Sequence, residues 1–317
     1  MRAVLSLLAM LLALTAAAPA AAWTRPGHMV TAAIAYDEIQ RLRPDLLPVI
    51  AALLDAHPDR GPFQVAVDRS TGAERARRMF LECARWPDDV RLTLYDHPSW
   101  HAAMWPVVAA DAPPEARARA AARGDGPAGD AIQALQLNLH VLGDPKATTS
   151  DRAMSLCWAL HVLGDIHQPL HTAELFSAAW PHGDGGGSLE YVQDPIGPEP
   201  IVLHWLWDDS INRSGVAADV DRRAREIEAA HPRSSLAALS AATGPDRFTA
   251  WAHGESYPLA VSFAYGAGIP TAPTAAAAPA VPDAYWQRLR REAEVRIALA
   301  GYRIADEVIA ALDAAKR

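Results

Sequence analysis

The chain has 317 residues, and half of them are hydrophobic. Its 29 lysine and arginine residues face 37 aspartate and glutamate residues, which gives a formal charge of −8. Such an acidic balance argues against a broad basic surface that grips nucleic acid through its phosphates, so any phosphate contact needs a local positive charge such as a bound metal. The length allows one large domain or two small ones.

The first 22 residues have the pattern of a secretory signal peptide. Arg2 supplies the charged start, residues 4–14 form a short apolar stretch, and residues 20–22 provide an Ala-x-Ala cleavage site. The apolar stretch is shorter than the roughly 20 residues of a membrane-spanning helix. We therefore expect export to the periplasm or the medium, with Trp23 as the first residue of the processed chain.

Helical periodicity dominates the rest of the chain. Asp151 has the position of a helix start, and only residues 188–193 and 200–204 have a strand-like pattern. The expected helices cover residues 28–55 with a break near Pro44, 72–87, 129–144, 150–168 and 283–315.

Two stretches near residues 111–129 and 267–283 are rich in proline, glycine and alanine, which is typical of flexible surface loops. Neither stretch separates two regions of different composition, and the chain shows no internal repeat. The sequence therefore predicts an all-α protein in which residues 23–317 form a single, mainly helical domain.

The chain has two cysteines, Cys83 and Cys157. In an exported protein they could form one disulfide, and a buried free thiol is the alternative. Neither cysteine has the spacing of a cysteine-based zinc site.

The segment WALHVLGDIHQPLH, residues 158–171, holds three histidines and one aspartate. His161 and Asp165 stand four residues apart, on one face of a helix. Pro169 ends that helix because it lacks an amide donor, so His171 can turn back toward the same pocket. A helix with hydrogen-bonded core histidines is one interpretation, and a zinc site with nitrogen and oxygen ligands is the other.

Other segments carry the same residue types and favour the zinc interpretation. His204 and Asp208 again stand four residues apart, Asp88 follows a predicted helix, and His101 comes 13 residues later. His28 lies close behind the predicted new N-terminus. A hydrolytic zinc enzyme needs several such ligands in one cleft, with open positions for water and substrate.

Together these segments resemble the zinc-dependent single-strand nucleases, the family of nuclease S-one and nuclease P-one, which shares its fold with the bacterial zinc phospholipases C. The resemblance covers nearly the whole chain after residue 22, and HVLGDIHQPLH is its most recognisable stretch. It implies a mainly helical domain with a cleft that holds three zinc ions.

The resemblance also implies which residues bind these ions. The three sets are Asp88, His101, His161 and Asp165 for the first zinc ion, His171, His204 and Asp208 for the second, and Trp23, His28 and Asp165 for the third. Asp165 would bridge two ions. Trp23 would bind through its α-amino nitrogen and its carbonyl oxygen, and the amine is free only after signal-peptide cleavage.

The implied activity is hydrolysis of single-stranded DNA and RNA to 5′-nucleotides, with 3′-nucleotidase activity and without stable membrane association or oligomerisation. Asp165 would orient the attacking water, and Arg91 matches the arginine that contacts phosphate in the family. A zinc phospholipase C is the alternative. The five-residue step from Trp23 to His28, and an aspartate rather than a glutamate at Asp208, favour the nuclease.

Several positions depart from the family pattern. Thr24 follows Trp23 where glycine is common, and residues 102–104 lack the aromatic and acidic side chains that often read the base. Base stacking could instead use Trp100, Trp105 or Trp180. DNA or RNA preference and base preference are therefore left open.

Two further features belong to the same motif region. His167 has the wrong helical phase for the face of His161 and Asp165, so we interpret it as structural or as hydrogen-bonded to a ligating group. HGDGGGS, residues 182–188, resembles the family's glycine turn before the last ligand pair, with Ser188 where asparagine is usual.

Overall fold

The computed structural model describes residues 23–316, apart from residues 62, 64–69, 242 and 267. The predicted signal peptide, residues 1–22, lies outside the described residues. In the part of the chain that is described, none of the helices combines the length and the hydropathy that crossing a membrane requires.

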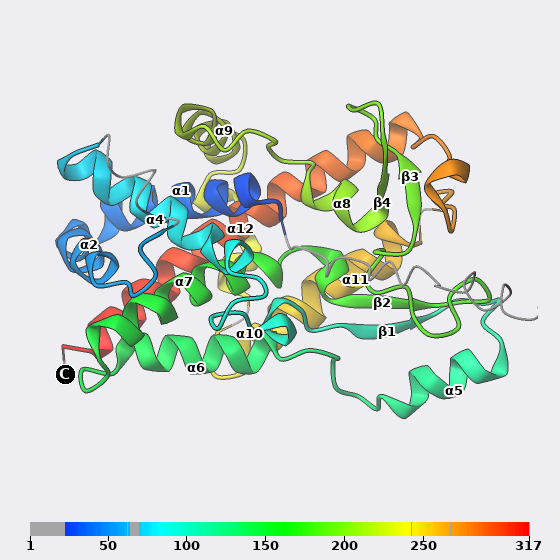
Figure 1. Ribbon diagram of the computed structural model, residues 1–317, viewed down its shortest axis with the longest axis horizontal. Helices are drawn as coiled ribbons and strands as arrows, with labels where there is room; N and C mark the ends of the chain where they lie inside the picture. Colours follow the sequence, from blue (N-terminus) through cyan, green and yellow to red (C-terminus); the bar gives the residue numbers. More distant parts are fainter. Residues whose placement is uncertain (1–22, 62, 64–69, 242, 267, 317) are drawn as a thin grey trace, which may run out of the picture.

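The fold is mainly helical, as predicted. Its centre is α7 (Thr149–Asp165), which packs against α4 (Gly72–Asp89), α6 (Ala131–Gly143) and α12 (Asp283–Ala314) (Figure 1). Helix α1 (Arg25–Leu42) packs against both α4 and α12. Every residue of α7 from 155 to 165 is buried, which marks a helix enclosed on all sides rather than an amphipathic surface helix.

The expected helices are present, and their ends follow local chemistry. The break near Pro44 separates α1 from α2 (Leu47–Asp55), and Pro87 lies in the last turn of α4. Helix α7 begins slightly before Asp151, because the Thr148 hydroxyl accepts a hydrogen bond from the Asp151 amide at 3.0 Å.

A disulfide joins α4 to α7. It links Cys83 to Cys157, whose Cα atoms lie 4.6 Å apart, so the structure selects the bridge over the free thiol. Asp88 follows Cys83 on α4, and His161 follows Cys157 on α7. The bridge therefore holds two of the predicted ligand segments side by side.

The described residues form two short sheets. The predicted strand segments form β3 (Tyr191–Gln193) and β4 (Pro200–Val202), which pair antiparallel. A parallel pair of β1 (Trp105–Val108) and β2 (Ala173–Phe176) was not predicted. This pair places the chain that follows His101 beside the chain that follows His171, because the Ala103 amide donates to the His171 carbonyl at 3.0 Å.

The two predicted loops contain more structure than expected. The prediction for residues 111–129 was wrong in that the stretch contains α5 (Pro114–Ala122), whose Ala116 and Ala120 cluster with Phe176 of β2. In the second stretch, Ala272 pairs with Tyr191 of β3 through two backbone hydrogen bonds. The remaining helices are α8 (Leu203–Asp208), α9 (Ala217–Ala230), α10 (Arg247–Trp251) and α11 (Tyr257–Leu259).

Candidate metal centre

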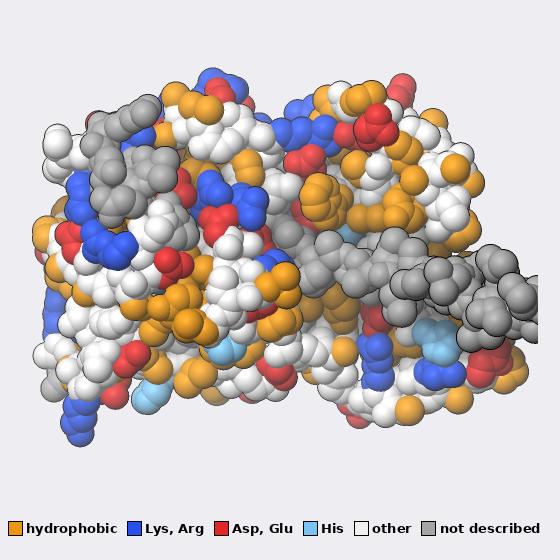
Figure 2. Space-filling view, in the orientation of Figure 1, with side chains coloured by type: hydrophobic (Ala, Val, Ile, Leu, Met, Phe, Trp, Pro, Cys, Tyr) orange, Lys and Arg blue, Asp and Glu red, His pale blue; other side chains and the backbone are white. Residues whose placement is uncertain are grey.

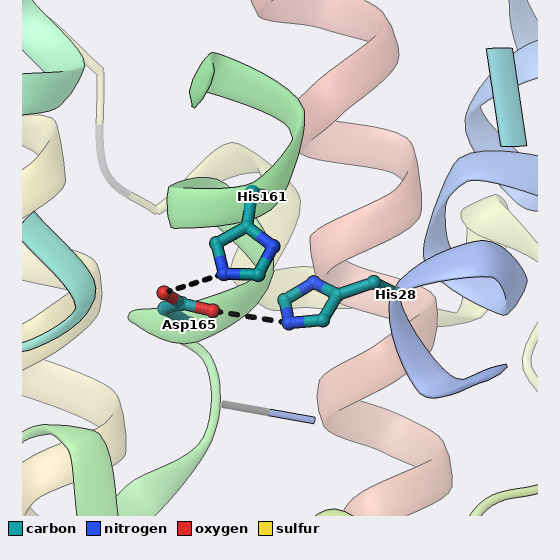
Figure 3. Close-up of side chains that lie close together, drawn as sticks. All are labelled: His28, His161 and Asp165. Carbon is teal, nitrogen blue, oxygen red and sulfur yellow. Dashed lines mark ion pairs between the residues drawn. The ribbon is translucent and has the colours of Figure 1, made fainter. Parts of the chain in front are cut away.

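Asp165, the last residue of α7, lies at the middle of the candidate site. Its carboxylate lies between two imidazole rings, one oxygen 3.3 Å from His28 Nε2 and the other 3.4 Å from His161 Nε2 (Figure 3). His161 comes from the preceding turn of α7, and His28 comes from the first turn of α1. All three side chains are fully buried.

A second group shares His161 with the first. His161 Nε2 lies 3.8 Å from Asp88 Oδ1 and 2.9 Å from His101 Nδ1. His101 Nδ1 in turn lies 3.3 Å from Asp165 Oδ2. The ligand atoms of Asp88, His101 and His161 lie within 4.8 Å of one another, so α4, the turn at residues 98–101 and α7 converge at one point.

The third group combines the residues after α7 with helix α8. His204 Nε2 lies 3.4 Å from Asp208 Oδ2 and 2.9 Å from His171 Nε2. The structure thus brings together the eight side chains that the sequence analysis singled out as metal ligands, in three groups of buried residues.

Backbone carbonyls fix the orientation of three histidine rings. Nδ1 of His161, His171 and His204 donates to the carbonyl oxygens of Ala84, His101 and Gly186 at 2.8, 2.6 and 2.6 Å, respectively. A histidine that donates from Nδ1 presents the lone pair of Nε2 on its other side. Each of these rings therefore presents its Nε2 lone pair to the group described above.

This arrangement is unfavourable without a cation. The Nε2 atoms of His171 and His204 face each other at 2.9 Å with lone pairs on both, which is repulsive unless a positive charge lies between them. Both Asp165 oxygens, both His28 ring nitrogens and Asp208 Oδ2 are buried without a hydrogen-bond partner among the described residues. Buried charges are normally paired or bind metal, so the donor set fits a metal cluster.

Burial also sets the protonation state of these groups. It lowers the pKa of His28, His101, His161 and His171, which keeps the imidazoles neutral as metal ligands must be. Burial raises the pKa of the Asp165 carboxyl, and the charge of Asp88 adds to this effect. A bound cation would reverse the shift at Asp165 by stabilising its ionised form.

Trp23 lies beside this cluster. Its side chain is fully buried, and its Nε1 donates to the carbonyl of Gly164, the residue before Asp165, at 3.0 Å. The next residue, Thr24, donates its amide to the Asp208 carbonyl at 3.2 Å. Trp23, the predicted first residue after signal-peptide cleavage, is thereby positioned between the Asp165 group and the Asp208 group.

Arg91 lies at the mouth of the site. Its guanidinium donates to Asp88 Oδ1 from Nη2 at 2.9 Å and from Nε at 3.3 Å. It lines a pocket of about 370 Å³ together with Asp88, Asp208 and Trp205. Figure 2 shows basic, acidic and hydrophobic side chains close together over the part of the surface where α8 lies.

Gly164 is a supporting residue that the sequence analysis missed. A Cβ atom at this position would lie 2.9 Å from His28 Nδ1, so only glycine lets α1 approach α7 this closely. The signal was a glycine inside a strong helical pattern. Gln168 was missed as well, and its Nε2 donates to Asp208 Oδ1 at 2.7 Å.

The glycine turn has the predicted geometry. Gly185, Gly186 and Gly187 have φ values of +64°, +67° and +81°, which residues with a Cβ atom rarely adopt. A Cβ at Gly186 would also lie 2.4 Å from the Leu170 carbonyl oxygen. The turn matters for the site because its carbonyls hold both His204 Nδ1 and the His204 amide.

Of the two interpretations of His167, the structure selects the structural one, because neither ring nitrogen contacts a ligating group. The ring is fully buried, Nδ1 donates to the Leu163 carbonyl at 2.7 Å, and Nε2 accepts from Arg303 at 2.8 Å. The tryptophans expected to stack on bases are also elsewhere. Trp100 is covered by His97, whose ring stacks on it at 3.8 Å, and Trp100, Trp105 and Trp180 do not line the pocket beside Arg91.

Comparisons with known proteins identify the family of the chain. The family model S1/P1 Nuclease matches residues 23–313. Nuclease S1 from Aspergillus oryzae is 30% identical over 105 residues, an alignment that covers 33% of each chain. Because the family match includes nearly every described residue, the chain belongs to the S1/P1 nuclease family.

Proposed function

We propose that the protein is an exported, monomeric, zinc-dependent endonuclease that cleaves single-stranded DNA and RNA to 5′-nucleotides and also acts as a 3′-nucleotidase. One observation carries this proposal. The Asp165 carboxylate is fully buried, receives no hydrogen bond from any described residue, and lies within 3.4 Å of ring nitrogens of His28, His101 and His161.

Zinc fits the donor set, which consists of imidazole nitrogens and carboxylate oxygens without a thiolate. We propose three ions, bound by Asp88, His101, His161 and Asp165, by His171, His204 and Asp208, and by Trp23, His28 and Asp165. When bound, zinc supplies Lewis acidity toward phosphate oxygens and makes water acidic enough to act as a nucleophile near neutral pH.

The side chains of the protein would position the attacking water and supply positive charge to the phosphate. Asp165 would orient the attacking water as well as join two ions, since both of its oxygens are directed into the cluster. Arg91 would donate from its planar guanidinium to phosphate oxygens, with Asp88 holding the group in place. The burial of the surrounding side chains excludes bulk water and strengthens both interactions.

The pocket supports a preference for single strands. It is a concave site of about 370 Å³ beside the cluster, and an unstacked nucleotide can turn into such a site whereas one held in a stiff duplex cannot.

A substrate panel tests the proposal. The chain that begins at Trp23 is purified with zinc and offered single-stranded DNA, RNA, 3′-AMP and phosphatidylcholine in parallel. We expect nucleotides with 5′-phosphates from both polymers, phosphate from 3′-AMP, and no reaction with the lipid. Release of choline phosphate without release of nucleotides would replace the proposal with a phospholipase C. The Asp165→Asn variant controls for contaminating nucleases.

A further inference from the structure

Two tryptophans on α8 have opposite surroundings. Trp207 is fully buried, and its Nε1 donates to the Tyr285 hydroxyl at 3.2 Å. Trp205 leaves 48% of its surface exposed, although it lies on the same short helix. Within the described part of the chain, the Trp205 indole makes no ring stacking contact, no cation–π contact and no hydrogen bond.

The exposed indole belongs to the cleft of the candidate metal centre. Trp205 follows His204 directly, and it lines the same pocket as Asp88, Asp208 and Arg91. Because His204 and Asp208 point into the cluster from one face of α8, the intervening Trp205 lies on the rim beside them. An aromatic face of this size with no partner is a stacking platform for a planar ligand.

The rim also carries arginines that can contact the phosphate of a nucleotide. Arg25 and Arg213 line the same pocket, with side chains that are 52% and 35% exposed. Both arginines already pair with carboxylates, Arg25 with Asp89 at 2.6 Å and Arg213 with Asp209 at 2.5 Å. These ion pairs weaken the attraction of the two arginines for phosphate, so an exposed aromatic face is a useful second contact for a nucleotide.

We propose that Trp205 forms a nucleobase-stacking subsite at the rim of the cleft, which holds the base of a nucleotide next to the scissile phosphate. The inference rests on the proposed function for the identity of the scissile bond. It also explains how the chain can stack a base although residues 102–104 lack the family's usual base-reading side chains. Stacking of this kind tolerates every base, so the subsite would contribute affinity without strong sequence preference.

The test compares base-containing and base-free strands. The variants are Trp205→Ala, Trp205→Leu and Trp205→Phe, and the control is Trp286→Ala, a partly buried indole on α12 that does not line the pocket. The substrates are a short oligothymidylate and a strand of the same length built from abasic residues. Zinc content and melting temperature are measured for each variant.

We expect Trp205→Ala and Trp205→Leu to lower kcat/KM on oligothymidylate about 10-fold, mainly through KM, because one base stack is lost. Trp205→Phe should retain most of the activity, and all variants should cleave the abasic strand as the parent does. The loss should persist at high salt, since stacking is not an ion pair. An equal loss on both strands, or no loss on oligothymidylate, would overturn the subsite.

A binding measurement separates this inference from the proposed function. Calorimetry with the zinc-loaded protein compares thymidine 5′-phosphate with deoxyribose 5-phosphate. We expect the parent to bind thymidine 5′-phosphate more tightly than deoxyribose 5-phosphate, and we expect Trp205→Ala to bind the two ligands with equal affinity. Protein that binds thymidine 5′-phosphate in this way but cleaves no strand would keep the subsite and overturn the nuclease proposal. Equal affinity of the parent for both ligands would overturn the subsite alone.

Discussion

Two fully buried carboxylates, Asp165 and Asp184, have opposite surroundings. Asp184 accepts hydrogen bonds from the amides of Leu175, Gly186 and Gly187 and from the Tyr265 hydroxyl, at 2.7 to 3.1 Å. Among the described residues Asp165 accepts none, and it faces histidine ring nitrogens instead. Hydrogen bonds within the fold thus satisfy Asp184, whereas the surroundings of Asp165 fit the proposed metal cluster.

The difference fits a structural role for Asp184 and the proposed metal-binding role for Asp165. A buried polar group without partners costs folding free energy, so it persists where something outside the chain restores the balance. Asp184 fixes the glycine turn whose carbonyls hold His204. Substitutions that change one of the two acids at a time separate these roles.

The largest effect is expected for Asp165→Asn. The asparagine amide cannot bridge two cations. Even the substitution of a residue that only hydrogen-bonds to a metal ligand costs roughly 10–100-fold in metal affinity or activity. We therefore expect more than about 100-fold loss of nuclease activity together with loss of bound zinc. Normal zinc content and turnover would contradict the bridging role.

The matched substitution Asp184→Asn should act on stability instead. An asparagine amide cannot accept all four hydrogen bonds that Asp184 accepts, and unsatisfied buried donors cost about 1–3 kcal/mol each. Denaturant unfolding should show that loss, while the folded fraction keeps its zinc. If the two variants behaved alike, the distinction between the carboxylates would be wrong.

Gly164→Ala tests the close packing behind His28. The new Cβ would lie 2.9 Å from His28 Nδ1, so we expect about 1–3 kcal/mol lower unfolding free energy and weaker zinc binding at the His28 group. Gly254→Ala is the control, because nothing lies within 4 Å of a Cβ there. Titration with a zinc chelator, in which the released zinc is quantified, measures the zinc affinity of each variant. Equal zinc affinity in both variants would contradict the packing argument.

One extra residue before Trp23 is expected to have a smaller effect on the same cluster. A chain that keeps Ala22 has an amide in place of the free amine of Trp23, so it should lack the third zinc ion and retain the other two. Mass spectrometry of the native protein with bound metal distinguishes these forms. Full occupancy in the extended chain would contradict the predicted role of the Trp23 amine.

The smallest effect concerns pH and the turn around Asp184. Burial, and then the charge of Glu190, raise the pKa of Asp184 to about 8. Between pH ~4 and ~8 the native protein thus holds a proton that the unfolded chain has lost, so this group makes stability fall as pH rises. Glu190→Gln removes the neighbouring charge, lowers the pKa of Asp184, and should reduce that fall. An unchanged pH dependence of unfolding would contradict the coupling.

The sequence predicted the parts of the site that depend on local spacing. A four-residue step places His161 and Asp165 on one face of α7, and the same step places His204 and Asp208 on one face of α8. The strands at residues 191–193 and 200–202 were also predicted, because the alternation of polar and apolar residues is a local signal.

The parts that depend on contacts between distant segments could not be predicted in this way. The disulfide between Cys83 and Cys157 stayed one of two alternatives until the geometry of α4 and α7 was known. The parallel pairing of β1 with β2 could not be predicted from local sequence, because strands as short as residues 105–108 and 173–176 show no clear alternation of polar and apolar residues. The exposure of Trp205 also follows from how α8 docks, because the sequence alone does not distinguish it from the buried Trp207.

Metal analysis of the correctly processed protein tests the central claim most directly. The chain beginning at Trp23 is purified without chelators, and its zinc is quantified by inductively coupled plasma mass spectrometry beside Asp165→Asn. We expect three zinc ions per chain in the parent protein, and in the variant we expect loss of the ions that Asp165 would join. A processed protein that carries no tightly bound metal would contradict the claim.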